Sequence, residues 1–121
     1  MKRDMEIVRE ILNIIAEDKE KDYSRPIIIE GVSKEKIDYH IEIMVDADIL
    51  KGNLSYGDNG LHFVSLSLSW RGNDFYDAFK NKTRWNGFKK WLKGKGESVG
   101  DLPFDLLIEA SKVYLKDRLG L

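Results

Sequence analysis

The sequence contains no cysteine and only two histidines, His40 and His62. Without cysteine the chain forms no disulfide and has neither a thiol nucleophile nor a thiolate ligand for a metal ion. The two histidines lie on different predicted elements, and neither stands at metal-ligand spacing from a second histidine. We therefore expect no metal site and no thiol chemistry.

Long hydrophobic runs are also lacking. No apolar stretch approaches the roughly 18 residues that a membrane-spanning helix needs. The opening MKRDMEIVRE places acidic side chains directly beside apolar ones, which is unlike a signal peptide. These features predict a cytoplasmic protein that does not enter a membrane.

A strong net charge is the third absence. The chain has 20 Lys and Arg against 21 Asp and Glu, a formal net charge of −1, so no overall field draws it to nucleic acid or to an anionic membrane. The distribution is nevertheless uneven. Residues 78–95 carry 7 basic groups and no acidic one, whereas residues 1–77 carry 10 basic and 16 acidic groups. The sequence thus sets a basic segment against an acidic remainder.

What is present is an ordered series of helix and strand signals. Apolar periodicity, N-cap residues and turn residues predict the sequence of elements. The series begins with a helix from about Arg3 or Asp4 to Glu17, a solvated loop over 17–25 and a short strand over PIIIEG at 26–31. A helix capped by Ser33 follows and ends near Ala47 or Asp48, and a hairpin comes after it. The last elements are a helix capped by Ser69 that runs through Phe79 and two further helices over 84–93 and 103–119.

The predicted hairpin consists of ILKGNLSY and LHFVSLSLSW on either side of GDNG at 57–60. Asp and Asn between two glycines indicate a tight turn, because these residues accept positive φ. In the second strand apolar residues alternate with serines, which is typical of a half-buried strand. This alternation predicts that Leu66, Leu68 and Trp70 face the core.

Helix, short strand, helix and hairpin is the order of a winged-helix domain. We therefore predict an α+β, mostly helical fold, with a winged-helix-like core over residues 1–80 and an appended helical extension over residues 81–121. The usual second helix is missing or reduced to a turn around Gly31 and Val32. No linker is long enough to separate two domains, so residues 1–121 are interpreted as a single domain.

Two motifs carry a family resemblance. SKEKIDYHIEIMVDADIL at 33–50 resembles the last core helix of bacterial winged-helix regulators, and LSWRGNDFYDAF at 68–79 resembles their exit from the wing. With the opening MKRDM, Trp85 and the closing LGL, these motifs are similar to one small bacterial and prophage family, which is catalogued as a domain of unknown function. The resemblance covers nearly the whole chain.

The resemblance implies a winged-helix-like fold and an origin in a bacterium or a mobile element. It supplies no catalytic residues, because none are established for the family. It also implies a homodimer through residues 103–119, because such regulators often pair through this helix. One departure is Asp48, which stands where the helix-ending glycine usually is. Because Asp tolerates a left-handed cap less well than Gly, we expect a differently shaped helix end.

The outer face of the predicted helix 33–48 is acidic. Its carboxylates would repel the phosphates that a helix in the major groove must approach, and no Arg, Asn or Gln accompanies them to read bases. They belong to Glu35, Asp38, Glu42 and Asp46. We interpret the face as solvated rather than as a DNA reader; the other hypothesis is a protein-docking patch formed by Lys36, Tyr39 and Ile43.

KNKTRWNGFKKWLKGKG at 80–96 interleaves basic and aromatic residues, a combination that suits nucleic-acid binding. At helical spacing the aromatic residues and Leu92 occupy an arc of about 120°, so they are interpreted chiefly as core. The basic side chains remain for contacts with the phosphate backbone, without sequence reading. They are Lys80, Lys82, Arg84, Lys89, Lys90, Lys93 and Lys95.

Catalytic signatures are lacking. GKGESVG at 94–100 has no strand before it and no Lys-Ser or Lys-Thr pair after it, so it is not a phosphate-binding loop. No serine stands in a nucleophile-elbow context. His40 borders the inner helix face, where a hydrogen-bonded structural histidine is the simpler interpretation. We expect no enzymatic activity and no cofactor.

Two functions follow from the sequence. The first is a non-catalytic, winged-helix-like binding module of bacterial or phage origin, a regulatory or interaction protein that docks on another protein. The alternative is a DNA-binding transcriptional regulator that contacts the phosphates of duplex DNA through residues 80–95. Fold analogy favours the second and residue chemistry favours the first, and we narrowly favour the first.

Overall fold

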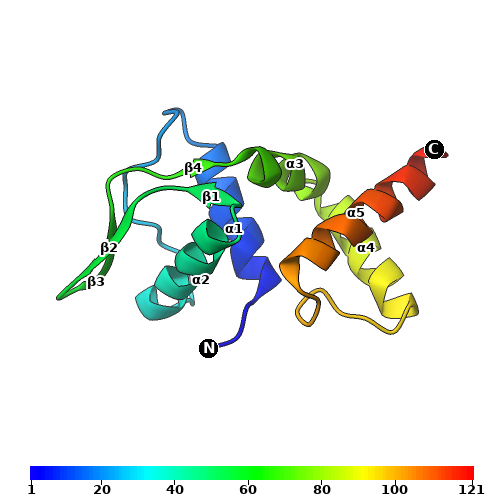
Figure 1. Ribbon diagram of the computed structural model, residues 1–121, viewed down its shortest axis with the longest axis horizontal. Helices are drawn as coiled ribbons and strands as arrows, with labels where there is room; N and C mark the ends of the chain where they lie inside the picture. The colour runs from blue at the N-terminus through cyan, green and yellow to red at the C-terminus, as the bar shows by residue number, and fades with distance from the viewer. The chain divides into compact units, whose positions relative to one another are not determined.

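The computed structural model describes all residues from Met1 to Leu121. It has an α+β fold that is mostly helical, as predicted, with two small antiparallel sheets (Figure 1). The elements are α1 (Met5–Ala16), α2 (Lys34–Asp46), β1 (Leu50–Lys51), β2 (Leu54–Gly57), β3 (Gly60–Phe63), β4 (Ser67–Leu68), α3 (Trp70–Phe79), α4 (Lys82–Gly94) and α5 (Phe104–Leu119). The chain divides into two compact units, Met1–Tyr76 and Asp77–Leu121, so the single-domain interpretation stays a prediction.

The core of the first unit is built on α1 and α2. The broad apolar arc predicted for the first helix is confirmed, because six of its side chains are buried: Met5, Ile7, Val8, Ile11, Leu12 and Ile15. Both helices begin at the predicted caps. The Glu6 N–H donates to Asp4 Oδ1 at 2.9 Å, and the Lys36 N–H donates to Ser33 Oγ at 3.2 Å.

The strand predicted over residues 26–31 is wrong. This segment pairs with no other strand, although its side chains alternate between buried Ile27 and Ile28, which is 82% exposed. The pairing occurs three residues earlier, where Tyr23 and Leu66 exchange two backbone hydrogen bonds of 2.8 Å. Whether a segment with strand propensity forms a strand depends on a partner strand, which the local sequence does not specify. A turn at Glu30–Gly31 then leads to α2.

The predicted hairpin is confirmed, with breaks in both arms. Sheet β1–β4 pairs Leu50 with Leu68, and sheet β2–β3 pairs Leu54 with Phe63. Val64 and Ser65 interrupt the second arm, which shifts its alternation by one residue. The expectation that Trp70 faces the core is wrong, because Trp70 begins α3 and is 82% exposed.

The residues with positive φ differ from those that we expected from the sequence. In the GDNG turn the positive φ of 100° is on Gly60, whereas Asp58 and Asn59 are not in that region. At the end of α2, Asp48 adopts a φ of 57°. The expectation of a differently shaped helix end is therefore wrong, because Asp occupies the left-handed conformation that glycine usually provides.

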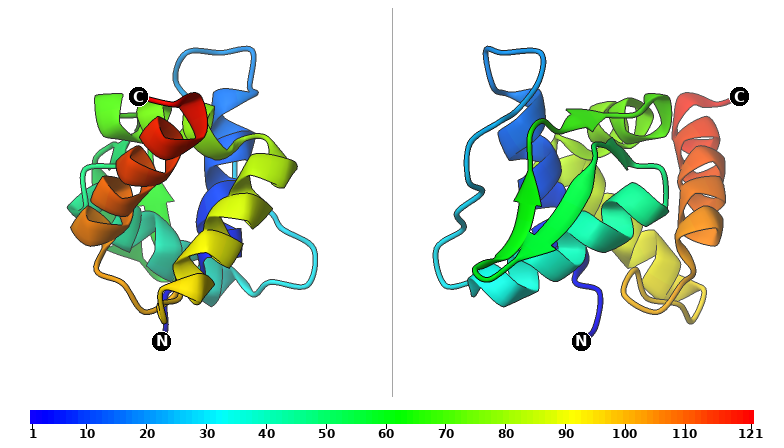
Figure 2. Two further views of the ribbon diagram at one scale, coloured as in Figure 1. Left: turned by 90° about the vertical axis from the view of Figure 1, so that its right-hand side faces the viewer. Right: turned by 60° about the vertical axis from the view of Figure 1, so that its left-hand side comes forward.

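The second unit contains the end of α3 and the pair α4 and α5, which lie side by side (Figure 2). Helix α4 begins two residues earlier than predicted, because the Asn81 side chain caps it by accepting from the Arg84 N–H at 3.0 Å. Helix α5 follows Pro103, close to the predicted bounds. Phe79 stacks on Phe88 at a centroid separation of 4.8 Å, and Tyr114 packs against Phe88 at 5.5 Å with the two rings tilted, so aromatic rings form this core.

Candidate protein-docking groove on α2 and the hairpin

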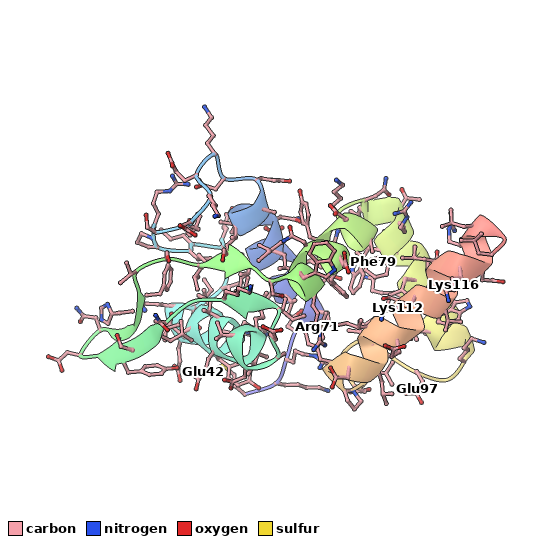
Figure 3. The ribbon with its side chains drawn as sticks, turned by 45° about the horizontal axis from the view of Figure 1, so that its top comes forward. Glu42, Arg71, Phe79, Glu97, Lys112 and Lys116 are labelled. Atoms are coloured by element: carbon pink, nitrogen blue, oxygen red, sulfur yellow. The ribbon has the colours of Figure 1, made fainter.

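The β2–β3 hairpin is attached to the acidic face of α2 (Figures 1 and 2). The Tyr56 hydroxyl on β2 donates to Glu42 Oε2. The Leu61 N–H on β3 donates to Asp38 Oδ2 at 3.2 Å, and the same oxygen accepts from Lys34 Nζ at 2.7 Å. Figure 3 shows Glu42 on the side of α2 that is next to the hairpin. Two of the four carboxylates on this face therefore hold the hairpin.

Gly60 allows the tip of the hairpin to approach α2. A Cβ at this position would lie 2.8 Å from Asp38 Oδ2 and 3.0 Å from Lys34 Nζ, which is closer than side chains pack. The positive φ of 100° would strain any other residue as well. Gly60, the second glycine in GDNG, is thus needed both for the turn and for the contact with the Lys34–Asp38 ion pair.

In the contact between Tyr56 and Glu42, the Tyr56 hydroxyl is the hydrogen-bond donor and the Glu42 carboxylate is the acceptor. The hydrogen bond to Glu42 raises the pKa of Tyr56 to about 12, because ionisation would place a phenolate against a carboxylate. Burial and the negative charges of Glu42, Asp38 and Asp46 act in the same direction. The hydroxyl is therefore protonated at neutral pH and can keep donating to Glu42.

An open groove of about 450 Å³ lies between α2 and the hairpin. Its walls include the rings of two tyrosines and three carboxylates, and its one basic side chain is that of Lys34, which pairs with Asp38. The lining residues are Met1, Lys34, Glu35, Asp38, Tyr39, Glu42, Tyr56, Asn59 and Gly60. Carboxylates and aromatic faces together attract cations, so the groove suits a positively charged group.

A second hollow, of about 250 Å³, lies between residues 24–27, α2 and β3. It is mainly apolar, with isoleucines, Leu61 and Phe63 in its walls. The lining residues are Ser24, Arg25, Pro26, Ile27, Lys34, Ile37, Asp38, Ile41, Asn59, Leu61, His62 and Phe63. The two hollows share Lys34, Asp38 and Asn59, so they are neighbours.

The structure separates the three predicted docking residues. Lys36, Tyr39 and Ile43 are all half-buried on α2, but only Tyr39 lines the groove. Sequence reasoning missed Tyr56 as a partner of this helix. The alternation of the hairpin strand gave no sign of it, because the contact joins residues that are 14 positions apart on different elements.

His40 is a hydrogen-bonded structural residue, as predicted. Its side chain is fully buried. Nε2 accepts from the Asp4 N–H at 2.8 Å, which leaves Nδ1 as the donor to the Lys36 carbonyl oxygen at 2.7 Å. The histidine thereby ties the start of α1 to α2. His62 is exposed on β3.

The aromatic residues of the basic segment are core, as predicted: Trp85 and Phe88 are fully buried and Trp91 is half-buried. At 100° per residue, four lysines of α4 follow the opposite side of the helix, within an arc of about 100°. They are Lys82, Lys89, Lys90 and Lys93.

The other basic residues of this segment have local contacts. Lys80 pairs with Asp77 at 3.7 Å. Arg84 Nη1 donates to the Ala78 carbonyl oxygen at 3.4 Å. The Lys95 ammonium lies 4.9 Å from the centre of the Trp91 ring. The four lysines of the stripe present a regular basic surface on α4, and Lys89 Nζ also lies 5.6 Å from the centre of the Trp85 ring.

Two general features of the structure bear on binding. No group of three or more His, Asp or Glu side chains is arranged to hold a metal ion. None of the helices is both long and apolar enough to cross a membrane.

Comparison with known proteins identifies relatives along nearly the whole chain. A family model described as "Hypothetical protein (DUF2513)" matches residues 2–98. The chain is 24% identical over 122 residues to an uncharacterized protein of Haemophilus influenzae, a match that covers 99% of this chain and 100% of the relative. No solved structure matches. The matches confirm the resemblance to a family of unknown function.

Proposed function

From the premise that this chain belongs to the DUF2513 family of hypothetical proteins, we propose that it is a non-catalytic, winged-helix-like binding module that docks on another protein. The order of α1, α2 and the β2–β3 hairpin supports the winged-helix interpretation. The left-handed close of α2 at Asp48 supports it further. The relative in Haemophilus influenzae supports a bacterial origin.

The observation that carries the proposal is the groove of about 450 Å³ between α2 and the hairpin. In a DNA-reading winged helix the corresponding face would meet phosphates. Here Asp38 and Glu42 on this face bind the hairpin, and Glu35 adds a further carboxylate to the groove. This charge opposes phosphate and favours a protein surface with basic groups.

The test compares two substitutions on the same helix. Tyr39→Ser removes a wall of the groove, whereas Ile43→Ser changes a half-buried residue one turn away that does not line it. We expect the purified partner of the wild-type chain to bind Ile43→Ser and to lose binding to Tyr39→Ser. Circular dichroism checks that both variants fold.

Two results would contradict this placement. Equal binding by Tyr39→Ser and the wild type would remove the groove from the contact. Loss of binding with Ile43→Ser alone would instead place the contact on the patch formed by Lys36, Tyr39 and Ile43.

A second candidate function is contact with the phosphate backbone of duplex DNA through α4. The observation in its favour is the stripe of Lys82, Lys89, Lys90 and Lys93, because no acidic residue occurs within α4. Backbone contacts of this kind weaken steeply as salt rises. They would bring the protein to DNA without reading bases.

Fluorescence anisotropy of a labelled random duplex at two salt concentrations tests this candidate. The double variant Lys89→Glu with Lys93→Glu should weaken binding by at least about tenfold at low salt, since each reversed charge removes phosphate contacts. Lys112→Glu with Lys116→Glu on α5 is the matched control, with the same charge change in the same unit (Figure 3). Equal weakening by both pairs would show a general charge effect rather than a site on α4.

A further inference from the structure

We infer that the groove and the neighbouring apolar hollow together bind one extended peptide segment, which carries a basic residue and an apolar residue at alternate positions. This inference rests on the proposed docking function and names the chemistry of the partner. The two hollows share Lys34, Asp38 and Asn59. They therefore meet at the first turns of α2, under the tip of the hairpin.

The groove selects the basic residue. Three carboxylates line it, and the single lysine there is already paired with Asp38. Asp38 and Glu42 also accept hydrogen bonds from the hairpin, whereas the Glu35 carboxylate makes no hydrogen bond or ion pair within the chain. A Lys or Arg side chain would therefore find a carboxylate at Glu35 and ring faces at Tyr39 and Tyr56.

The second hollow selects the apolar residue. The apolar part of its wall is formed by Ile27, Ile37, Ile41, Leu61 and Phe63. Its volume of about 250 Å³ is below the roughly 300–1,000 Å³ of pockets that enclose drug-sized molecules. A single apolar side chain, inserted as an anchor, fits such a hollow better than a separate small ligand.

The junction between the hollows determines the form of the peptide. In an extended chain, residues two positions apart point to the same side and lie about 7 Å apart. A basic and an apolar residue at such positions can enter the two adjacent hollows together. Asn59 lies at the junction, where its amide can both donate to and accept from the peptide backbone.

Selection from a phage-displayed library of random peptides on the full chain tests the inference. We expect enriched sequences to pair Lys or Arg with an apolar residue at alternate positions. A selected peptide, labelled with fluorescein, is then titrated with the protein. Replacing either its basic residue with Glu or its apolar residue with Ser should raise the Kd at least about tenfold, since each removes one anchor.

Matched protein variants locate the contacts. Glu35→Lys should weaken peptide binding at least about tenfold, whereas Glu97→Lys, the same charge change on an exposed residue of the second unit, should not. Phe63→Ser should weaken it similarly, whereas Ile28→Ser should not, because Ile28 is exposed and lines neither hollow. The peptide variants keep the test decisive if Phe63→Ser fails to fold.

The outcomes separate this inference from the proposed function. Enrichment of acidic peptides, or of basic peptides that bind without an apolar residue, would overturn the inference. If such peptides or a protein partner still depend on Tyr39, docking at the groove survives. Binding that is indifferent to Tyr39, Glu35 and Phe63 would remove both.

Discussion

Gly72 lies in the first turn of α3, against the backbone that follows α2. Its N–H donates to Ser69 Oγ at 3.0 Å, and a Cβ at this position would lie only 2.1 Å from the Ile49 carbonyl oxygen. The glycine in LSWRGNDFYDAF is therefore required by a close contact between two backbones. The hairpin exit and the end of α2 are held together at this point.

Gly72→Ala is expected to destabilise the protein by about 1–3 kcal/mol, because the overlap outweighs the roughly 1 kcal/mol that Ala gains over Gly in a helix. Gly94→Ala is the control: its added Cβ would meet no atom within 4 Å, so we expect no loss of stability. Urea unfolding measures both changes. Equal stability of the two variants would contradict the close-contact explanation.

Several single residues could be predicted from the sequence, and others could not. Ser33 and Ser69 were identified as caps, because capping depends on residues only a few positions apart. His40 was identified as structural from its place on the helix wheel. The left-handed φ of 57° at Asp48 was not expected, because Asp adopts this conformation less readily than Gly. The turn from α2 into β1 requires it all the same.

At the scale of elements, the hairpin and α2 are joined by side-chain hydrogen bonds into one structural unit. The sequence predicted each of them, since local periodicity and the GDNG turn are sufficient for that. It did not predict that Asp38 and Glu42 would hold the hairpin, because these contacts join distant parts of the chain. For the same reason the predicted strand at 26–31 was wrong: the pairing of Tyr23 with Leu66 depends on tertiary structure.

The Tyr56–Glu42 contact should be visible in a titration. A difference absorbance titration of the wild type against Tyr56→Phe should show phenolate forming near pH 12, and Glu42→Gln should return that midpoint toward 10. Because the folded pKa is above the unfolded one, the contact's contribution to stability is complete below about pH 10 and is lost as the pH rises toward 12. A wild-type midpoint near 10 would show that the hydroxyl does not donate to Glu42.

For the whole molecule, the uneven charge of the sequence acquires a structural meaning. Three acidic groups of helix 33–48 line a groove in the first unit, and the four lysines of 82–93 form a stripe on a helix of the second unit. The net charge of −1 conceals two surfaces with opposite preferences. The sequence was sufficient to predict an acidic helix face and a basic segment. It was not sufficient to predict the groove, because the groove exists only where the hairpin lies beside α2.

The most direct test of docking at the groove is a map of backbone amide shifts in the ¹⁵N-labelled full chain during titration with a library-selected peptide. Our account predicts saturable shifts at Glu35, Tyr39 and Tyr56, with the amides of α4 unchanged. Shifts confined to α4, or to residues outside both hollows, would contradict it.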